Sequence, residues 1–269
     1  MPLHKDAIAA LSGQDPVRAH WDKWDVESLD DKHWAAAERR LIRRYIPARP
    51  GVRLLDAGCG EGEGTAEYAQ QGGVGEVLGI DYSPTRLSMA IRRCQGQPNV
   101  SFNEVDLRAA GPLPSAHFDC IICTRVLINL KDWNEQQAAL DSLIRALAPG
   151  GRLVLLEGSV QGQAELNGIR AMFGLAPIEC RWFNQFLDDA VLEAHIAAEH
   201  GLTLVNKTGL GAFFLLTRGI RQFFDTGPDL HWDTEYNRIA ASEDMEKAMP
   251  LGKRYSRVRL WVYDKAPAV

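Results

Sequence analysis

The sequence lacks long hydrophobic runs, an excess of basic charge and a targeting segment. Its longest apolar runs, such as residues 213–216, are far shorter than the roughly 20 residues that a membrane-spanning helix needs. The 269 residues carry 30 Lys and Arg against 35 Asp and Glu, with both signs interspersed, so we expect no basic face for nucleic acid. The first 15 residues show neither the apolar core nor the cleavage pattern of a signal peptide. These absences predict a protein with no membrane or nucleic-acid partner.

Cysteine is scarce, and its distribution argues against disulfides. There are five cysteines, scattered along the chain, and a reducing cytoplasm is therefore the expected location. Cys120 and Cys123 form a C-x-x-C pattern inside the apolar run FDCIICT, which is typical of a buried strand. Strand residues three apart point to opposite faces, which favours two apolar strand residues over a zinc or redox pair.

No metal site is expected from the remaining candidate ligands. His195 and His200 are five positions apart on a predicted helix, a poor spacing for a shared ion. No pair of acids with a neighbouring asparagine suggests a magnesium site. We therefore predict a protein without a bound metal.

Strand-like and helix-like segments alternate through the first part of the chain. With 46% hydrophobic residues, the chain is long enough for one large core. This rhythm predicts an α/β fold with a parallel sheet covered by helices on both faces. The expected strands are 52–56, 76–81, 100–105, 118–123 and 152–157, and the expected helices are 62–71, 84–94 and 133–147.

The alternation of strands and helices does not extend beyond residues 52–157 on either side. Residues 1–50 form a predicted N-terminal helical segment that serves as a lid, and residues 51–269 form the main domain. Within the main domain we expect an irregular insertion at 159–187 and a partly helical one at 209–256. A helix over 188–200 should end at Gly201, since glycine is the usual residue after a helix C-terminus. Strands are expected at 202–207 and 258–263.

A glycine-rich turn follows the first predicted strand. Residues 52–65 read VRLLDAGCGEGEGT, so a strand ends in an acid and runs into alternating glycines. Such a turn exposes main-chain N–H groups to a ligand at a helix N-terminus. In a dinucleotide-binding G-x-G-x-x-G turn, the third glycine would fall at Glu63, and Glu61 adds a second carboxylate. Two acids disfavour a pyrophosphate, which leaves a phosphate-free nucleoside or a purely structural turn.

The segment LDAGCGEG resembles the first motif of the Rossmann-like (class I) S-adenosylmethionine (SAM) dependent methyltransferases, small-molecule branch. The resemblance implies a seven-stranded, mostly parallel sheet with an antiparallel last strand, and SAM as the cofactor. It also implies a set of cofactor-binding residues: Asp56, Gly58, Cys59, Gly60, Gly62, Asp81, Tyr82, Asp106, Leu107, Thr124 and Arg125.

The acids in this set have separate implied roles. Asp81, in GIDYS, ends the second strand, and its two oxygens can accept from both ribose hydroxyls. Asp106 is implied to accept from the adenine amine, next to the backbone N–H of Leu107. Asp56 is expected near the methionine end. For Asp81 and Asp106 the alternative is an acid that only stabilises its own turn.

Three residues are candidates for catalysis: Asn129, Glu157 and His20. In the family, the strand that ends FDCIICT is often followed by a histidine, where this chain has Asn129. Glu157 ends the fifth strand, and His20 reaches the site if the N-terminal segment folds back. The candidate substrate-binding residues are Arg125, Asn129, Asn167, Arg170, Trp182, Asn184, Tyr236 and Asn237.

The leading hypothesis is SAM-dependent methyl transfer to an oxygen or nitrogen atom of a small polar metabolite. The metabolite is expected to be sugar-like or anionic, from specialised metabolism or surface glycans. Three alternatives stay open: a methyltransferase for a protein or tRNA, a SAM-binding protein without transfer, and an NAD-linked oxidoreductase. The sequence does not decide between a monomer and a homodimer.

Overall fold

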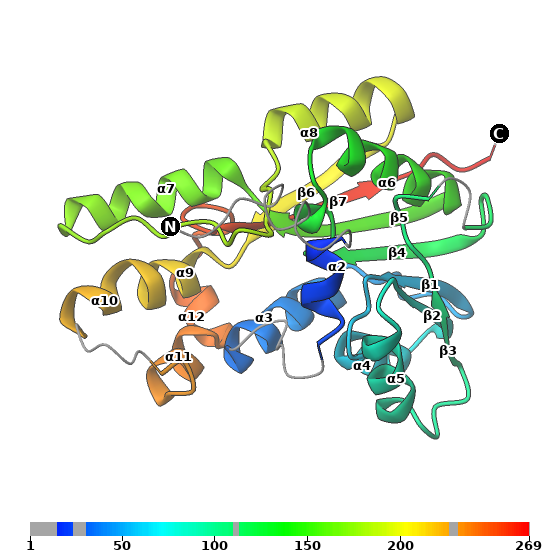
Figure 1. The fold of residues 1–269 in the computed structure, drawn as a ribbon, viewed down its shortest axis with the longest axis horizontal. Helices are drawn as coiled ribbons and strands as arrows, with labels where there is room; N and C mark the ends of the chain where they lie inside the picture. Colours follow the sequence, from blue (N-terminus) through cyan, green and yellow to red (C-terminus); the bar gives the residue numbers. More distant parts are fainter. Residues whose placement is uncertain (1–14, 24–30, 110–112, 226–230, 269) are drawn as a thin grey trace.

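A seven-stranded sheet flanked by helices forms the centre of the molecule (Figure 1). The computed structural model describes residues 15–23, 31–109, 113–225 and 231–268. The strands are β1 (Val52–Ala57), β2 (Val74–Asp81), β3 (Val100–Glu104), β4 (Phe118–Thr124), β5 (Leu147–Gly158), β6 (Thr203–Gly209) and β7 (Val258–Asp264).

The helices lie between these strands and at both ends of the described chain. The first group is α2 (Pro16–Trp21), α3 (Lys32–Arg43), α4 (Glu63–Ala69), α5 (Pro84–Arg93), η1 (Leu127–Asn129), α6 (Trp133–Ala146) and α7 (Val160–Met172). The second group is α8 (Asp189–His195), η2 (Ile196–His200), α9 (Gly211–Phe214), η3 (Leu215–Ile220), α10 (Arg221–Phe224), α11 (Glu235–Ala240) and α12 (Glu243–Ala248).

The strand order is β3-β2-β1-β4-β5-β7-β6, and β7 pairs antiparallel with both β5 and β6. The other neighbouring pairs are parallel. The predicted fold class is confirmed, including the antiparallel last strand. The order in which the chain adds strands to the sheet changes direction between β1 and β4: β2 and β3 lie on one side of this point, and β5 lies on the other. In open α/β sheets, ligands bind at the carboxyl ends of the strands at such a point.

Alternation along β4 divides the core between the two faces of the sheet. Cys120 and Ile122 pack with the apolar side of α3 on one face, and Ile121 and Cys123 pack with α6 on the other. Each fully buried aliphatic side chain contributes roughly 1.5–3 kcal/mol to folding. The two cysteines of the C-x-x-C pattern therefore lie on opposite faces, as predicted, and serve as core residues.

The insertion at 159–187 is more ordered than predicted. Its first part forms α7, a helix of 13 residues whose N-cap is Ser159, with Oγ accepting from the Gly162 backbone N–H at 2.9 Å. Glycine weakens a helical pattern in sequence, which is why the helix was not expected. A Cβ at Gly162 would lie 2.0 Å from the Ser256 carbonyl oxygen, so this glycine serves close packing and not a turn.

The described part of the N-terminal segment contains two helices, each capped by an aspartate. Asp15 accepts from the backbone N–H groups of Val17 and Arg18, and Asp31 accepts from those of His33 and Trp34. Residues 1–14 and 24–30, which the predicted helical segment also includes, lie outside the described residues. The division into a lid and a main domain stays a prediction.

The late insertion, α9 to α12, packs beside α3 at one end of the sheet (Figure 1). The helix over 188–200 ends at Gly201, as predicted, and Gly201 has a φ of 59°. Within the described residues, no helix is both long enough and apolar enough to cross a membrane.

Candidate functional site

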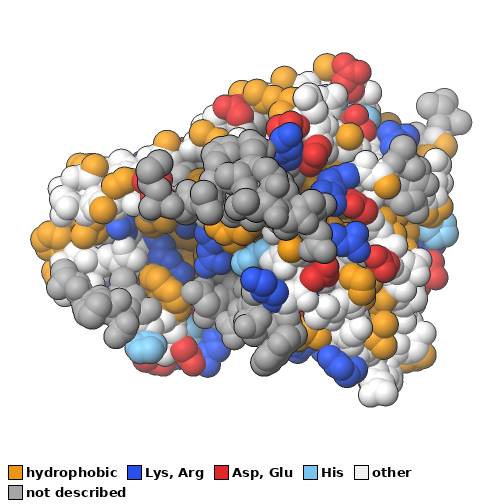
Figure 2. Space-filling model, viewed as in Figure 1, with side chains coloured by type: hydrophobic (Ala, Val, Ile, Leu, Met, Phe, Trp, Pro, Cys, Tyr) orange, Lys and Arg blue, Asp and Glu red, His pale blue; other side chains and the backbone are white. Residues whose placement is uncertain are grey.

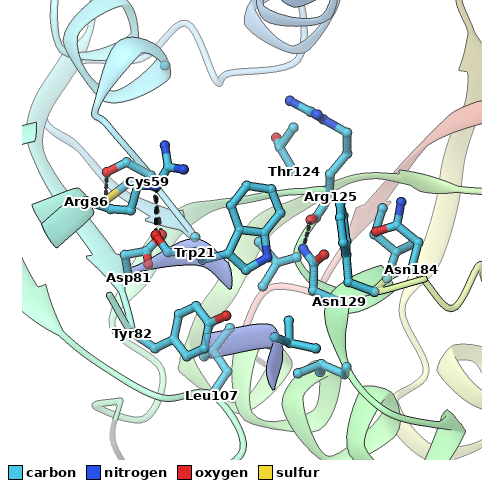
Figure 3. Close-up of a pocket in the computed structure, with 18 of the residues that line it drawn as sticks. Trp21, Cys59, Asp81, Tyr82, Arg86, Leu107, Thr124, Arg125, Asn129 and Asn184 are labelled. Carbon is cyan, nitrogen blue, oxygen red and sulfur yellow. Dashed lines mark hydrogen bonds between the residues drawn. The ribbon is translucent and has the colours of Figure 1, made fainter. Parts of the chain in front are cut away.

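A cavity of about 910 Å³ lies at the carboxyl ends of β1, β2 and β4. The glycine-rich turn, the end of β2 and the segment after β3 form one end of it, which we call the cofactor end. The other end, which we call the acceptor end, is formed by Arg125, Asn129, Arg181, Phe183, Asn184, Phe186 and Arg257. Figure 3 shows the indole of Trp21 in view between Asp81 on one side and Arg125 on the other.

The glycines of the turn have two distinct uses. Gly58, Gly60 and Gly62 all have positive φ, at 74°, 53° and 78°. A Cβ on Gly58 would lie 2.1 Å from Val126 Cγ2, and one on Gly62 would lie 2.9 Å from Ala90 Cβ. A Cβ on Gly60 would meet nothing within 4 Å, so Gly60 faces the open cavity. Gly58 and Gly62 therefore permit close packing, and Gly60 permits close approach of a ligand.

Asp81 closes the turn from the neighbouring strand. Its Oδ2 accepts from the Gly60 N–H and its Oδ1 from the Ser83 N–H, both at 2.9 Å. Burial raises the pKa of Asp81, against the lowering effect of these two hydrogen bonds. The two hydrogen bonds fix the orientation of the carboxylate. It lies on the cavity wall, where a pair of ribose hydroxyls can donate to it.

Asp56 and Cys59 lie under the turn. Asp56 accepts from Thr65 Oγ1 at 2.6 Å, and burial raises its pKa to about 6. Burial also raises the pKa of the Cys59 thiol. Both residues line the cavity, but a thiol with a raised pKa is a poor nucleophile, so Cys59 contributes backbone wall.

Asp106 is already engaged by an arginine. Arg108 Nη2 lies 2.7 Å from Asp106 Oδ2, and the hydrogen bond from Arg108 is the largest cause of the lowered pKa of Asp106. Arg108 also pairs with Asp15, the N-cap of α2. Asp106 and Leu107 line the cavity, so the implied adenine contact stays a prediction. The Asp106–Arg108–Asp15 chain holds α2 against this end of the cavity.

Glu61 and Glu63, the two acids of the turn, do not carry uncompensated charge. Glu61 forms an ion pair with Arg86, and Glu63 Oε2 lies 3.0 Å from Arg39 Nη1. Both carboxylates are therefore compensated, and their charges alone do not exclude an anionic ligand.

Several buried polar atoms on the cavity wall have no protein partner within the described ranges. They are Trp21 Nε1, Tyr82 OH, Thr124 Oγ1 and Asn129 Oδ1. Unsatisfied buried polar atoms cost roughly 1–3 kcal/mol each, so a set of four facing one cavity fits a polar ligand. Together with Asp81 and the open face of Gly60, they fit a nucleoside with an amino-acid tail, as SAM has.

The acceptor end begins at a strained residue. Arg125 follows β4 directly and has a φ of 54°, which is uncommon for a residue with a side chain. Its carbonyl accepts from Asn129 Nδ2 at 2.6 Å, and its Nε lies 3.3 Å from Glu38 Oε2. Glu38 is buried on the cavity wall, accepts from Trp34 Nε1 at 2.7 Å and has a pKa raised by burial. The sequence did not single out Glu38, because it lies inside an ordinary amphipathic helix.

Glu157 does not reach the cavity. It is fully buried, and its carboxylate accepts from the backbone N–H groups of Val126 and Leu127, both at 2.9 Å. Ile128 N–H lies 3.3 Å from the other oxygen. Burial raises the pKa of Glu157 to about 7. The expected role as a base is therefore wrong: Glu157 stabilises the N-terminus of η1.

His20 is also displaced from the wall. Its ring stacks on Phe183, with centroids 4.6 Å apart and planes at 28°, and burial lowers its pKa. It is not among the residues that line the cavity in the described part of the chain. Nothing in this arrangement supports His20 as a general base.

Of the expected substrate-binding residues, Arg125, Asn129 and Asn184 line the acceptor end. The others do not line the cavity and have structural contacts instead. Asn167 binds the Ile178 backbone, Arg170 binds the carbonyls of Ala176 and Arg218, Trp182 packs on Phe183, Tyr236 donates to the Leu216 carbonyl, and Asn237 donates to Asp31. Gly62, expected to bind cofactor, also packs against α5 and not the cavity.

Two arginines at the acceptor end were missed. Arg181 and Arg257 both line the cavity, and Arg257 Nε is buried with no partner in the described part of the chain. Burial lowers the pKa of Arg257 to about 10. Arg257 reaches the site because β7 pairs antiparallel with β5, which places Val258 beside Gly158. A separation of about 100 residues gave no sequence signal for this neighbour.

The strand order and the turn after β1, with the acid that ends β2, define a Rossmann-like fold, in which ligands bind at the switch point of the sheet. Residues 54–151 match the family described as a methyltransferase domain.

Relatives of known name agree with this match. The chain is 35% identical over 133 residues to a demethylmenaquinone methyltransferase of Tropheryma whipplei strain Twist, covering 49% of this chain and 50% of that protein. It is 34% identical over 128 residues to the ubiquinone/menaquinone biosynthesis C-methyltransferase UbiE of Shewanella oneidensis, covering 45% and 49%. The chain thus spans about half the length of the curated relatives it matches.

Among solved structures, the N-methyltransferase NodS of Bradyrhizobium japonicum WM9, in complex with S-adenosyl-L-homocysteine, has the same fold. The TM-score is 0.57 at 17% identity, over 93% of this chain and 96% of that one. Residues 54–151 are therefore a methyltransferase domain with the fold of the class I SAM-dependent methyltransferases, and SAM is its cofactor.

Proposed function

We propose that this protein transfers a methyl group from SAM to an oxygen or nitrogen atom of a small polar metabolite that carries an anionic group. The observation that carries the proposal is the single cavity with two unlike ends: a cofactor end built around Asp81 and Gly60, and an acceptor end that contains Arg181 and Arg257. SAM supplies a methyl group already activated by its sulfonium, so the chain must mainly align the acceptor and exclude water.

The chain's own residues support each part of this task. Asp81 and the turn would hold the nucleoside, and Trp21 on α2 contributes to the wall between the two ends. Arg125, fixed by Glu38 and by its strained backbone, borders the space between β4 and α3. Arg257, whose Nε has no protein partner in the described ranges, is suited to a carboxylate or phosphate of the acceptor.

A small acceptor is favoured over a protein or tRNA. The cavity wall includes residues of α2 and α3 as well as the sheet edge and four residues of the insertion after β5: Arg181, Phe183, Asn184 and Phe186. A macromolecular substrate would need an accessible mouth and, for tRNA, a basic surface, whereas the net charge is −5 and the face in Figure 2 shows acidic as well as basic side chains. Residues of the N-terminal segment instead line the cofactor end of the cavity.

The names of the two relatives suggest a second class of acceptor. Both are quinone-pathway methyltransferases, and the one from Shewanella oneidensis is named a C-methyltransferase. A quinone ring carbon needs an apolar acceptor end. The pair Arg181 and Arg257 favours an anionic acceptor instead, and we keep the quinone acceptor as the competing outcome of the test.

The experiment measures transfer of labelled methyl from SAM to two panels of acceptors. One panel holds small amines and alcohols that carry a carboxylate or phosphate, and the other holds demethylated quinones. The proposal expects label in the first panel. It also expects Arg257→Gln to raise KM for that acceptor roughly 10- to 100-fold, since hydrogen bonds between charged groups are worth about 1.5–3 kcal/mol.

Arg254→Gln is the matched control, because Arg254 is exposed and bonds to Tyr255 OH outside the cavity. It should leave KM unchanged. Label confined to the quinones, or an Arg257→Gln enzyme with an unchanged KM, contradicts an anionic acceptor. Absence of any transfer by a protein that binds SAM would favour a binding protein.

A further inference from the structure

Two histidines and an aspartate converge on the side of the molecule formed by α6 and α8. His195 Nε2 and His200 Nε2 each lie 2.7 Å from the same oxygen, Asp141 Oδ1. One ligand atom from each of the three residues falls within 4.8 Å of the other two. Their side chains are 10%, 16% and 24% exposed for His195, His200 and Asp141, so the cluster is sheltered but within reach of solvent.

The local backbone explains why the sequence gave the opposite expectation. On an ideal α-helix, residues five apart are separated by about 140° around the axis and do not share a face. Here the helix continues after His195 as a π-helix, η2, in which each residue bonds to the one five positions away. This places His195 and His200 on one face, so the spacing argument against a shared site is wrong.

The cluster is separate from the methyltransferase cavity. None of its three residues lines that cavity. Asp141 lies in the middle of α6, whose Leu140 and Leu143 are fully buried against the sheet, so the helix is rigidly placed. The two histidines come from the helical segment that leads into β6, which lies at one edge of the sheet, opposite β3.

We propose that Asp141, His195 and His200 form a binding site for a divalent transition metal, with Zn²⁺ the best match. Two imidazole nitrogens and one carboxylate oxygen are a donor set that Zn²⁺ and Fe²⁺ take, whereas Mg²⁺ and Ca²⁺ take oxygen ligands. Three protein ligands leave a fourth position for water, which the partial exposure of the cluster permits.

A metal in this position joins α6 to the α8–η2 segment. Binding to the folded state only stabilises it, so the metal would strengthen the attachment of the segment that precedes β6. Because the cluster lies outside the cavity, the site acts on stability and not on the methyl-transfer chemistry. The proposal is independent of the proposed function.

The test uses the full chain, purified without a histidine tag and treated with a chelator. Calorimetry with ZnCl₂ is expected to show one Zn²⁺ per chain and a rise in Tm on binding. The double variant His195→Ala/His200→Ala and the single variant Asp141→Asn should each bind Zn²⁺ at least 10-fold more weakly and lose most of the Tm rise. Cobalt substitution should give the visible absorption of a low-coordinate site in the wild type alone.

The control is His117→Ala, because His117 is a surface histidine 3.9 Å from Glu76 and away from the cluster. It should bind Zn²⁺ as the wild type does. If the double variant does not fold, the wild-type titration and the cobalt spectrum still decide the question. Failure of the wild type to bind Zn²⁺ at one per chain, or equal binding by a folded double variant, overturns the proposal.

Discussion

The two ends of the cavity differ in how the chain builds them. At the cofactor end, the ligand-facing groups follow closely on the strands that carry them: Gly60 comes three residues after β1, and Asp81 is the last residue of β2. At the acceptor end, they come from distant segments: Arg125 follows β4, Asn184 lies in the insertion after β5, and Arg257 precedes β7. A local motif specifies the first end, and tertiary pairing specifies the second.

The difference also appears in the charges. At the cofactor end, the carboxyl groups of Asp56 and Asp81 have pKa values raised by burial. At the acceptor end, the guanidinium group of Arg257 has a pKa lowered by burial. Each end therefore has ionisable groups that are partly removed from water. This costs free energy unless a ligand with complementary polar or charged groups binds there. Polar hydroxyls and an ammonium suit the first end, and an anion suits the second.

The largest expected effect concerns the glycine turn. Gly58→Ala places a Cβ 2.1 Å from Val126 Cγ2 at a φ of 74°, which should lower the free energy of unfolding by about 2–4 kcal/mol. Gly60→Ala meets no protein atom and should cost only about 1 kcal/mol, while still weakening SAM binding. Denaturant unfolding with and without S-adenosylhomocysteine separates the two. Equal stability of both variants would show that Gly58 is not a packing residue.

The second prediction concerns Glu157, which we assign to the scaffold of the acceptor end. Its folded pKa of about 7 lies above the ordinary value of 4.5, so the folded state binds its proton more tightly than the unfolded state does. The stabilisation is complete below pH 4.5 and is lost as the pH rises through 7. It amounts to at most roughly 3 kcal/mol.

Glu157→Gln should remove this pH dependence, measured as the difference in unfolding free energy between the variant and the wild type at pH 4.5 and 7.5. The control is Asp264→Asn, which lies outside the cavity and breaks the ion pair with Arg152 at the opposite end of β5. This variant should keep the pH dependence that Glu157 causes. A difference that does not change with pH would refute the assignment.

The smallest effect concerns the contact that holds α2 in place. Asp15→Asn keeps an oxygen to cap α2 but removes the ion pair with Arg108, which is partly exposed. Such pairs are worth about 0–1 kcal/mol, so S-adenosylhomocysteine should bind only a few-fold more weakly. The loss should shrink at high salt, because salt screens the wild-type pair. Calorimetry at two ionic strengths measures it, and a salt-independent loss would show that the ion pair is not the cause.

Much of the fold and of the cofactor end was predictable from the sequence, because both depend on local pattern. Periodicity placed the strands of the sheet, and the positions of Gly60, Asp81 and Leu107 follow from motifs next to those strands. The pairing of Glu61 with Arg86 was not predictable, since it depends on how α5 packs against the turn.

The acceptor end was less predictable for the same reason. Glu157 lies at the carboxyl end of β5, on the side of the sheet where ligands bind, yet its carboxylate accepts hydrogen bonds from backbone N–H groups at η1. No pattern of residues in the sequence predicts this orientation. Asn167 and Asn237 looked like ligands because they are polar and lie in insertions, but each satisfies backbone or side-chain groups within the scaffold. Arg257 and Glu38 reach the cavity only through tertiary packing.

The most direct test of the two-ended cavity compares one variant from each end by calorimetric titration with S-adenosylhomocysteine. Asp81→Asn should weaken binding on the order of 100-fold, since it removes the charged acceptor for the ribose hydroxyls. Arg257→Gln should leave the affinity within about twofold of the wild type, because Arg257 faces the acceptor end. Equal losses in both variants, or an unchanged affinity in Asp81→Asn, would contradict the division of the cavity into a cofactor end and an acceptor end.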